Sequence, residues 1–150
     1  IGTSLRKDCI HLFEKIPDDL MPVLVHPQQI EQVFLNIITN AMHALAEKHV
    51  EKPNGKTLTI EAFEFVQNDQ PFVRISFLDN GIGIPAGLLD RVTQSFVTTK
   101  KSGAGLGLSI SRKIIESHGG TIRLESRVGE YTRVSIDLPA VKPVESNEIK

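Results

Sequence analysis

One long amphipathic segment, residues 27–48, constrains the fold of this chain more than any other feature. Pro27 suits the first turn of a helix, where its missing N–H would have no partner in any case. A helix with one apolar stripe must bury that stripe against a second layer of structure. The stripe follows the three- and four-residue spacing of a helix face and consists of Ile30, Val33, Phe34, Ile37, Ile38, Ala41 and Leu45.

The remaining regular segments are predicted to be strands, with one further helix. Hairpin turns are expected at residues 68–71 and around Gly129. Strands joined as hairpins, with helices between the pairs, predict an α/β (α+β) two-layer sandwich, in which helices cover one face of a mixed β-sheet. The predicted strands are 8–16, 57–66, 72–78, 121–126 and 132–138, and the second helix is 105–118 with Gly119 as its stop.

The length of 150 residues fits a single domain, which we place at residues 8–139. We interpret residues 1–7 as the remnant of a linker from an absent preceding domain, because the chain has no initiator Met. Residues 140–150 are polar and are interpreted as a C-terminal tail or linker.

Composition excludes several classes of protein. A net charge of −1 argues against nucleic acid as the main partner, because phosphate binding usually shows as a basic excess. No apolar stretch approaches the roughly 20 residues that a membrane helix needs. The lone Cys9 excludes an internal disulfide and favours a reducing compartment.

A polar stripe lies beside the apolar one on the first helix. Asn36, Asn40, His43 and Glu47 share one face of that helix. The neutral carbonyl oxygen of an Asn side chain suits a hard cation such as Mg²⁺. An ordinary solvated polar face is the alternative, and this helix alone leaves it open.

A glycine-containing loop, residues 79–85 (Asp-Asn-Gly-Ile-Gly-Ile-Pro), directly follows a predicted strand. Asp79 is placed to accept a hydrogen bond from an exocyclic amino group such as that of adenine. Gly81 and Gly83 would let the backbone approach a flat ring closely. The alternative is an ordinary turn, since Asp-Asn-Gly is a common turn sequence.

A second glycine-rich segment, residues 103–108 (Gly-Ala-Gly-Leu-Gly-Leu), opens the second helix. Glycines at a helix start expose N–H groups and the positive end of the helix dipole, which favours an anion. Residues 98–101, Thr-Thr-Lys-Lys, add hydroxyls and two cations just before it. The spacing is neither a Walker A loop nor a Rossmann fingerprint. A flexible, helix-capping loop is the alternative.

The three features in this order resemble the catalytic ATP-binding domain of sensor histidine kinases. That domain has the Bergerat ATP-binding fold, which gyrase-type topoisomerases and Hsp90 chaperones share. The N box of the family matches residues 32–41, its first glycine box 79–85, its F box 95–100 and its second glycine box 103–108. Four boxes in the right order cover nearly the whole chain.

The resemblance implies ATP and Mg²⁺ as cofactors and assigns roles to residues. Asp79 would accept from the adenine amino group, with Gly81 and Gly83 in the loop against the ring and Thr132 supporting Asp79. Asn40 would be the Mg²⁺ ligand through its side-chain oxygen, with Asn36 one turn earlier and His43 where relatives often have a cationic phosphate contact. Asn36, Asn40 and Lys100 would take part in catalysis. The other implied nucleotide contacts are Thr98, Thr99, Lys100, Gly103, Gly105, Leu106, Gly107 and Leu108.

The resemblance further implies transfer of the γ-phosphoryl group to a histidine on a separate dimerisation domain that this chain lacks, with a response regulator downstream. Relatives that hydrolyse ATP carry Glu where this chain has Asn36, and an amide cannot act as a general base. None of the five histidines precedes an acidic residue, so we expect the acceptor outside the chain. A stand-alone serine kinase of the anti-sigma-factor type is the alternative.

The expected location is the cytoplasm, whether or not the parent protein is anchored in a membrane. The isolated domain is expected to be monomeric, with no nucleic-acid partner and no direct membrane contact.

Overall fold

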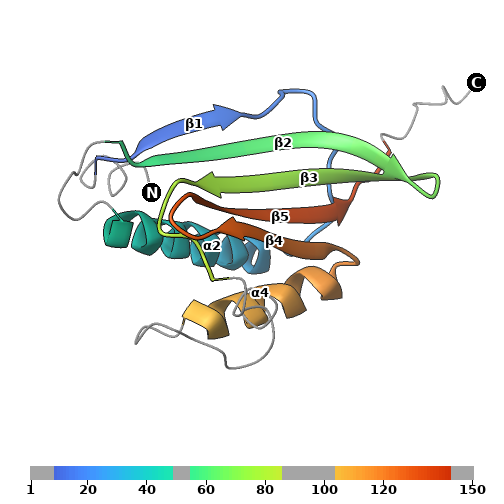
Figure 1. Cartoon of the computed structure of the whole chain (residues 1–150). Helices are drawn as coiled ribbons and strands as arrows, with labels where there is room; N and C mark the ends of the chain where they lie inside the picture. Colours follow the sequence, from blue (N-terminus) through green and yellow to red (C-terminus); the bar gives the residue numbers. More distant parts are fainter. Residues whose placement is uncertain (1–8, 49–54, 86–103, 143–150) are drawn as a thin grey trace, which may run out of the picture.

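A computed structural model describes residues 9–48, 55–85 and 104–142 of the chain. Helices and strands alternate along these ranges much as the sequence predicts (Figure 1). The elements are β1 (His11–Lys15), α2 (Pro27–Lys48), β2 (Thr57–Gln67), β3 (Gln70–Asp79), α4 (Ala104–Ser117), β4 (Thr121–Arg127) and β5 (Tyr131–Pro139). Residues 86–103, which precede α4, lie outside the described residues.

The strands form one mixed sheet in the order β1-β2-β3-β5-β4. Strands β1 and β2 are parallel, because α2 carries the chain back between them, and the other neighbours are antiparallel. Both described helices lie on the same face of the sheet (Figure 1). The predicted two-layer α/β sandwich is therefore confirmed.

The core lies between the helices and the sheet. The apolar stripe of α2 is buried there, with Val33, Ile37 and Leu45 at 2% exposure or less. Leu58 of β2 and Ile136 of β5 meet the stripe from the sheet side and are fully buried. Burial of this kind, worth about 1.5–3 kcal/mol for each large side chain, holds the two layers together.

Strand β1 is short and lies at the edge of the sheet. Leu12 is aligned with Leu58 on the helix-facing side, yet it is 36% exposed. Phe13 follows Leu12 and so lies on the other face of the sheet, and Ile16 lies just beyond the end of β1; both are about half exposed. An edge strand has a neighbour on one side only, so its side chains stay partly in solvent.

The hairpin between β2 and β3 is tighter than the predicted four-residue turn. Asn68 and Asp69 alone form the loop, and both have positive φ, 52° and 62°. Two such residues define the turn that matches the natural twist of a β-hairpin. Pro71 belongs to β3, opposite Val66, because a proline near a strand end removes only one ladder donor.

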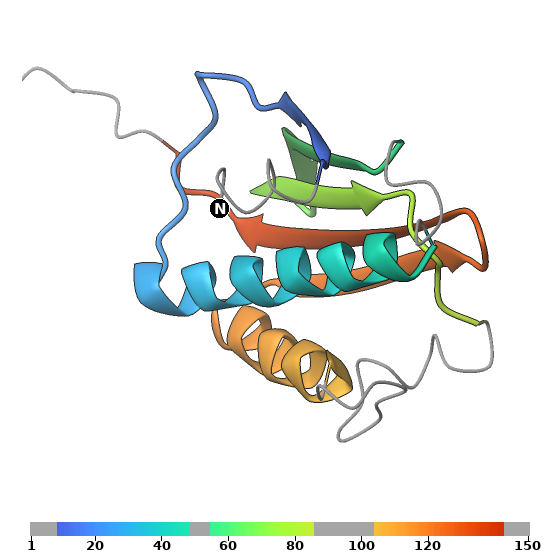
Figure 2. The same cartoon turned by 90° about the vertical axis from the view of Figure 1, so that its left-hand side faces the viewer.

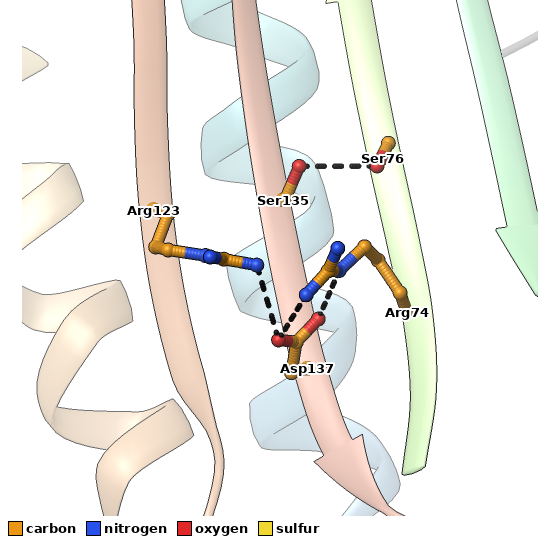
Figure 3. A network of polar contacts seen from close by, with 5 residues as sticks. All are labelled: Arg74, Ser76, Arg123, Ser135 and Asp137. Carbon is orange, nitrogen blue, oxygen red and sulfur yellow. Dashed lines mark hydrogen bonds and ion pairs between the residues drawn. The ribbon is translucent and has the colours of Figure 1, made fainter. Parts of the chain in front are cut away.

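The outer face of the sheet, away from the described helices, carries a charged network (Figure 3). Arg74 makes two parallel bonds to Asp137, at 2.6 and 2.8 Å, and Arg123 reaches the same carboxylate at 3.5 Å. The hydrogen bond to Asp137 raises the pKa of Arg74 above its ordinary value. Ser76 and Ser135 form a hydroxyl pair nearby, at 3.1 Å. The network joins β3, β5 and β4 side by side.

Backbone contacts continue past the end of β5. The Ala140 N–H donates to the Pro71 carbonyl at 2.8 Å, and Ala140 is buried. Val141 donates in the same way to Pro22, and Ala140 forms a bridge with Val23. The packed part of the chain therefore includes the segment that leads into α2.

Candidate functional site

The two helices run side by side in opposite directions (Figure 2). Near the start of α2, the His26 N–H donates to His118 Nε2, at the end of α4, at 3.1 Å. Further along α2, the Asn36 amide donates to the buried Ser111 at 3.4 Å. The start of α4 therefore faces the second half of α2, which brings two of the predicted boxes together.

A polar row crosses one end of the sheet on its helix-facing side. Asp79, at the end of β3, lies directly opposite Thr132 of β5, and Thr132 lies directly opposite Ser126 of β4. Alternation along β3 places Asp79 on the same face as the buried Phe77. Asp79 and Thr132 are only 4% and 7% exposed. The register therefore brings Asp79 and Thr132 side by side, and the role of Thr132 in supporting Asp79 stays a prediction.

The carboxylate of Asp79 turns into the glycine loop that follows it. Its Oδ1 accepts the Gly81 N–H at 2.9 Å. A carboxylate accepts several hydrogen bonds at its two oxygens, so this position can accept from an N–H group of a ligand in addition to the Gly81 N–H. An exocyclic amino group is such a donor.

Gly81 packs against the backbone of α2. A Cβ built on Gly81 would lie 2.6 Å from the carbonyl carbon of Ala44 and 2.8 Å from its Cβ. The neighbouring Ile82 N–H donates to the Ala44 carbonyl at 3.1 Å. Glycine is required here so that the loop can approach the helix, whereas the sequence suggested only approach to a ligand ring.

Gly83 packs in the same way against the turn between β4 and β5. It has φ of +76°, and a Cβ there would lie 2.9 Å from the Arg127 carbonyl carbon and closer still to its oxygen. The Gly129 N–H donates to the Ile82 carbonyl at 2.6 Å. The loop is thus clamped between α2 and the hairpin, and the role of Gly83 against an adenine ring remains a prediction.

Asn80 is a residue that the sequence analysis missed, because roles in this loop were assigned to Asp79, Gly81 and Gly83 and none to Asn80. Its Oδ1 accepts the Thr57 N–H at 2.8 Å, and its Nδ2 donates to the Gly55 carbonyl at 2.8 Å. Lys48, at the end of α2, donates to the Asn80 carbonyl at 3.0 Å. These bonds fix the loop to the start of β2, which the spacing of local residues could not reveal.

Asn40 lies one turn before Ala44 on α2. Its amide nitrogen Nδ2 is buried, and within the part of the chain that the structure describes no group accepts from it. A buried amide without a partner is costly, and such exceptions are often functional. Since no described group accepts a hydrogen bond from its nitrogen, the Asn40 side chain is compatible with a role in which its oxygen binds a cation such as Mg²⁺. His43 is exposed on the same side of α2.

The start of α4 carries the predicted phosphate contacts. Gly105, Leu106 and Gly107 lie in its first turn, where N–H groups have no partner within the helix. Leu108 is buried at 4% exposure, so its side chain belongs to the core. The other predicted contacts, Thr98, Thr99, Lys100 and Gly103, lie outside the described residues.

The described ranges contain neither a cluster of metal-binding side chains nor a helix suited to crossing a membrane. In residues 9–48, 55–85 and 104–142, no three His, Cys, Asp or Glu side chains gather in a way that would hold a metal ion. Neither helix in these ranges has the length and apolarity needed to cross a membrane.

Comparison with known proteins gives consistent matches. The sequence pattern described as histidine kinase-, DNA gyrase B-, and HSP90-like ATPase matches residues 25–142. Sporulation kinase E of Bacillus subtilis is 42% identical over an alignment of 124 residues, and the match covers 81% of this chain and 15% of that protein. The sensory histidine kinase/phosphatase NtrB of Salmonella typhimurium is 39% identical over an alignment of 132 residues, and the match covers 83% of this chain and 36% of that protein.

A solved structure matches over most of its length. The nucleotide-free catalytic domain of the histidine kinase ThkA has a TM-score of 0.76 and 30% identity, covering 94% of this chain and 87% of that one. By contrast, the chain spans well under half the length of sporulation kinase E or NtrB.

Proposed function

The chain belongs to the family of histidine kinase-, DNA gyrase B- and HSP90-like ATPases, and we propose on that premise that it is the ATP-binding catalytic domain of a sensor histidine kinase. In this proposal it binds ATP with Mg²⁺ and directs the γ-phosphoryl group to a histidine on a separate dimerisation domain. The observation that carries the proposal is the buried pair of Asp79 and Thr132, joined by the glycine loop to the helix that bears Asn40.

The adenine end of the site is assigned to Asp79. The carboxylate is buried and fixed by the Gly81 N–H, so it is oriented before a ligand arrives. Orientation of this kind reduces the entropy that binding would otherwise cost. The clamped loop, with Gly81 and Gly83, forms the wall beside it.

The phosphate end is assigned to the helices. Asn40 and Asn36 line the face of α2 toward α4, and Gly105 and Gly107 offer N–H groups at the start of α4. Mg²⁺, when bound, would neutralise charge on the phosphates. Lys100, Thr98 and Thr99 precede α4 in sequence and are proposed as further phosphate contacts, with His43 at the exposed edge.

Phosphoryl transfer is favoured over hydrolysis. Asn36 occupies the position at which hydrolysing relatives carry Glu, and its amide donates to Ser111. An amide cannot take a proton from water, so the chain supplies positioning and charge neutralisation rather than a general base. The nucleophile is therefore proposed to be a side chain of a partner domain.

The acceptor is proposed to be histidine rather than serine. The relatives reported above are named as histidine kinases or as a sporulation kinase, and ThkA is described as a histidine kinase. None of them supports the serine kinase of the anti-sigma-factor type. A dimerisation domain, a downstream response regulator and a cytoplasmic location follow from the same reasoning and are parts of the proposal.

Calorimetric titration of the chain with ATP and Mg²⁺ tests the binding. We expect binding by the wild type and a loss of at least about tenfold in affinity for Asp79→Asn, since the buried charged acceptor is removed. Labelling with radioactive ATP then tests the transfer. The chain alone should stay unlabelled, and a supplied dimerisation domain should gain acid-labile phosphate on histidine. Acid-stable label on serine or threonine would instead favour the alternative.

A further inference from the structure

Ser126 is not among the residues that the resemblance assigns, yet it lies at the centre of the polar row. We propose that Ser126 is a positioning residue that sets the direction of the Thr132 hydroxyl and fixes the glycine loop, and thereby determines selectivity for an adenine base. This inference rests on the proposed function, because it concerns the same site. In this proposal Ser126 does not contact the ligand itself. It acts through Thr132 and through the glycine loop.

The register places Ser126 for this role. Ser126 of β4 is the direct partner of Thr132 of β5, which is the direct partner of Asp79 of β3. Direct partners on neighbouring strands have Cβ atoms about 4.5–5.5 Å apart. The three side chains therefore form one continuous row on the helix-facing side of the sheet.

Three contacts converge on the single hydroxyl of Ser126. It donates to the Tyr131 carbonyl at 2.8 Å, and it accepts the Ile84 N–H at 2.7 Å. Its oxygen also lies 2.9 Å from the Thr132 hydroxyl oxygen. The glycine loop and the hairpin are thus joined through one side chain.

The direction of the bond between the two hydroxyls follows from these contacts. A hydroxyl has one proton to donate and two lone pairs. Since the Ser126 proton goes to the Tyr131 carbonyl, the Thr132 hydroxyl must be the donor in its bond to Ser126. The lone pairs of Thr132 then remain to act as acceptors beside Asp79.

Asp79 and Thr132 both offer hydrogen-bond acceptors, so the site favours a ligand with a donor at this position. Adenine presents an exocyclic amino group at the position where guanine presents a carbonyl oxygen. A site lined by Asp79 and an accepting Thr132 therefore favours ATP over GTP. Without Ser126, the Thr132 hydroxyl can rotate and donate, which would remove part of this preference.

The experiment compares ATP and GTP binding, each with Mg²⁺, by calorimetric titration of the chain and its variants. For Ser126→Ala we expect ATP affinity to fall about tenfold and GTP affinity to change by less than about twofold. Thr132→Val should act like Ser126→Ala, and the double variant should lose no more than either alone, because both remove one shared interaction. Ser126→Thr, which keeps the hydroxyl, should restore the ratio of the two affinities.

Ser135→Ala is the matched control. Ser135 lies three residues after Thr132 on β5 and also bonds to another hydroxyl, that of Ser76, but on the outer face of the sheet. Its loss should leave the ratio of ATP to GTP affinity unchanged. Far-UV circular dichroism of every variant separates unfolding from altered selectivity.

The possible outcomes are distinct. An unchanged affinity ratio in Ser126→Ala, in a chain whose wild type binds ATP in an Asp79-dependent way, overturns this inference and leaves the proposed function standing. Failure of the wild type to bind ATP overturns the proposed function and the inference with it. If Ser126→Ala does not fold, Thr132→Val decides, and an unchanged ratio in that variant also overturns the inference.

Discussion

Gly83→Ala is expected to damage the site by a mechanism that the structure makes quantitative. Gly83 has φ of +76°, and any L-residue in this region costs about 1–2 kcal/mol. The added Cβ would also lie 2.9 Å from both the Arg127 carbonyl carbon and the Val128 Cα. Both are backbone atoms, so no flexible side chain can move aside to relieve the contact.

Relief of the contact requires the glycine loop to separate from the hairpin. That movement breaks two hydrogen bonds, from Gly129 to the Ile82 carbonyl and from Ile84 to Ser126. Each contributes about 1 kcal/mol net. With the conformational cost added, Gly83→Ala should lower the free energy of unfolding by about 3–4 kcal/mol, a large part of the usual 5–15 kcal/mol.

Gly119→Ala separates the two parts of this cost. Gly119 has φ of +77°, but the nearest atom to its Cβ would be Pro139 Cγ at 3.5 Å, an ordinary contact. Gly119→Ala should therefore cost only the conformational part, about 1–2 kcal/mol. Urea unfolding followed by far-UV circular dichroism measures both variants, since the chain has no Trp and one Tyr.

ATP titration of the same two variants completes the test. Gly83→Ala should lose ATP affinity, because the loop beside Asp79 is displaced, and Gly119→Ala should keep it. Equal destabilisation by the two substitutions, or wild-type ATP affinity in Gly83→Ala, would refute the reasoning from backbone contact.

Two further substitutions test the division between site and scaffold. Asn40→Ala should change the free energy of unfolding by less than about 0.5 kcal/mol, because the buried nitrogen of Asn40 has no acceptor among the described residues. The same substitution should lower Mg²⁺-dependent ATP affinity at least about tenfold. Urea unfolding measures the first effect and calorimetric titration the second. Asp137→Asn should cost about 1–3 kcal/mol of stability and leave ATP affinity unchanged, and an altered affinity would contradict the assignment of the outer face to stability. Asp137 raises the pKa of Arg74, so the contribution of the Arg74 charge to stability is fully present below the ordinary arginine pKa and is lost only as the pH rises beyond it. The stability cost of Asp137→Asn should therefore be constant around neutral pH.

The sequence predicts those elements whose pattern burial imposes locally. The stripe of α2 repeats with the period of a helix because Val33, Ile37 and Leu45 all face one core. The order of strands and hairpins could also be predicted locally, since Gly129 and Asn68 lie in tight turns and mark where one strand ends and the next begins. Only the exact ends differ, as at Pro71.

Interactions between distant strands were not predictable in this way. Arg74 meets Asp137 because β3 and β5 are neighbours in a particular register, and nothing near either residue in sequence indicates that pairing. The same holds for Asn80 with Thr57 and for Ser126 with Ile84. The sequence shows that these residues are polar, but their partners depend on the register of the complete sheet.

Glycine requirements were predicted at the right positions for an incomplete reason. The sequence indicates that a side chain is excluded at Gly81 and Gly83, and a ligand ring was the simplest explanation. The structure shows that helix and hairpin backbone already occupy the space a Cβ would take. Local sequence cannot distinguish these causes, since both demand the same residue.

The register between β3 and β5 also bears on how the protein folds. Each hairpin closes a short loop, but Asp79 meets Thr132 only when β3 pairs with β5, across the whole of α4 and the segment before it. Pairings this far apart in sequence form slowly, because closing the loop between them costs entropy. A slip of one residue would turn Asp79 to the wrong face. The capacity to bind a nucleotide should therefore arise late in refolding, after both hairpins have formed, and a bound nucleotide would stabilise only chains whose central strands have found the correct alignment.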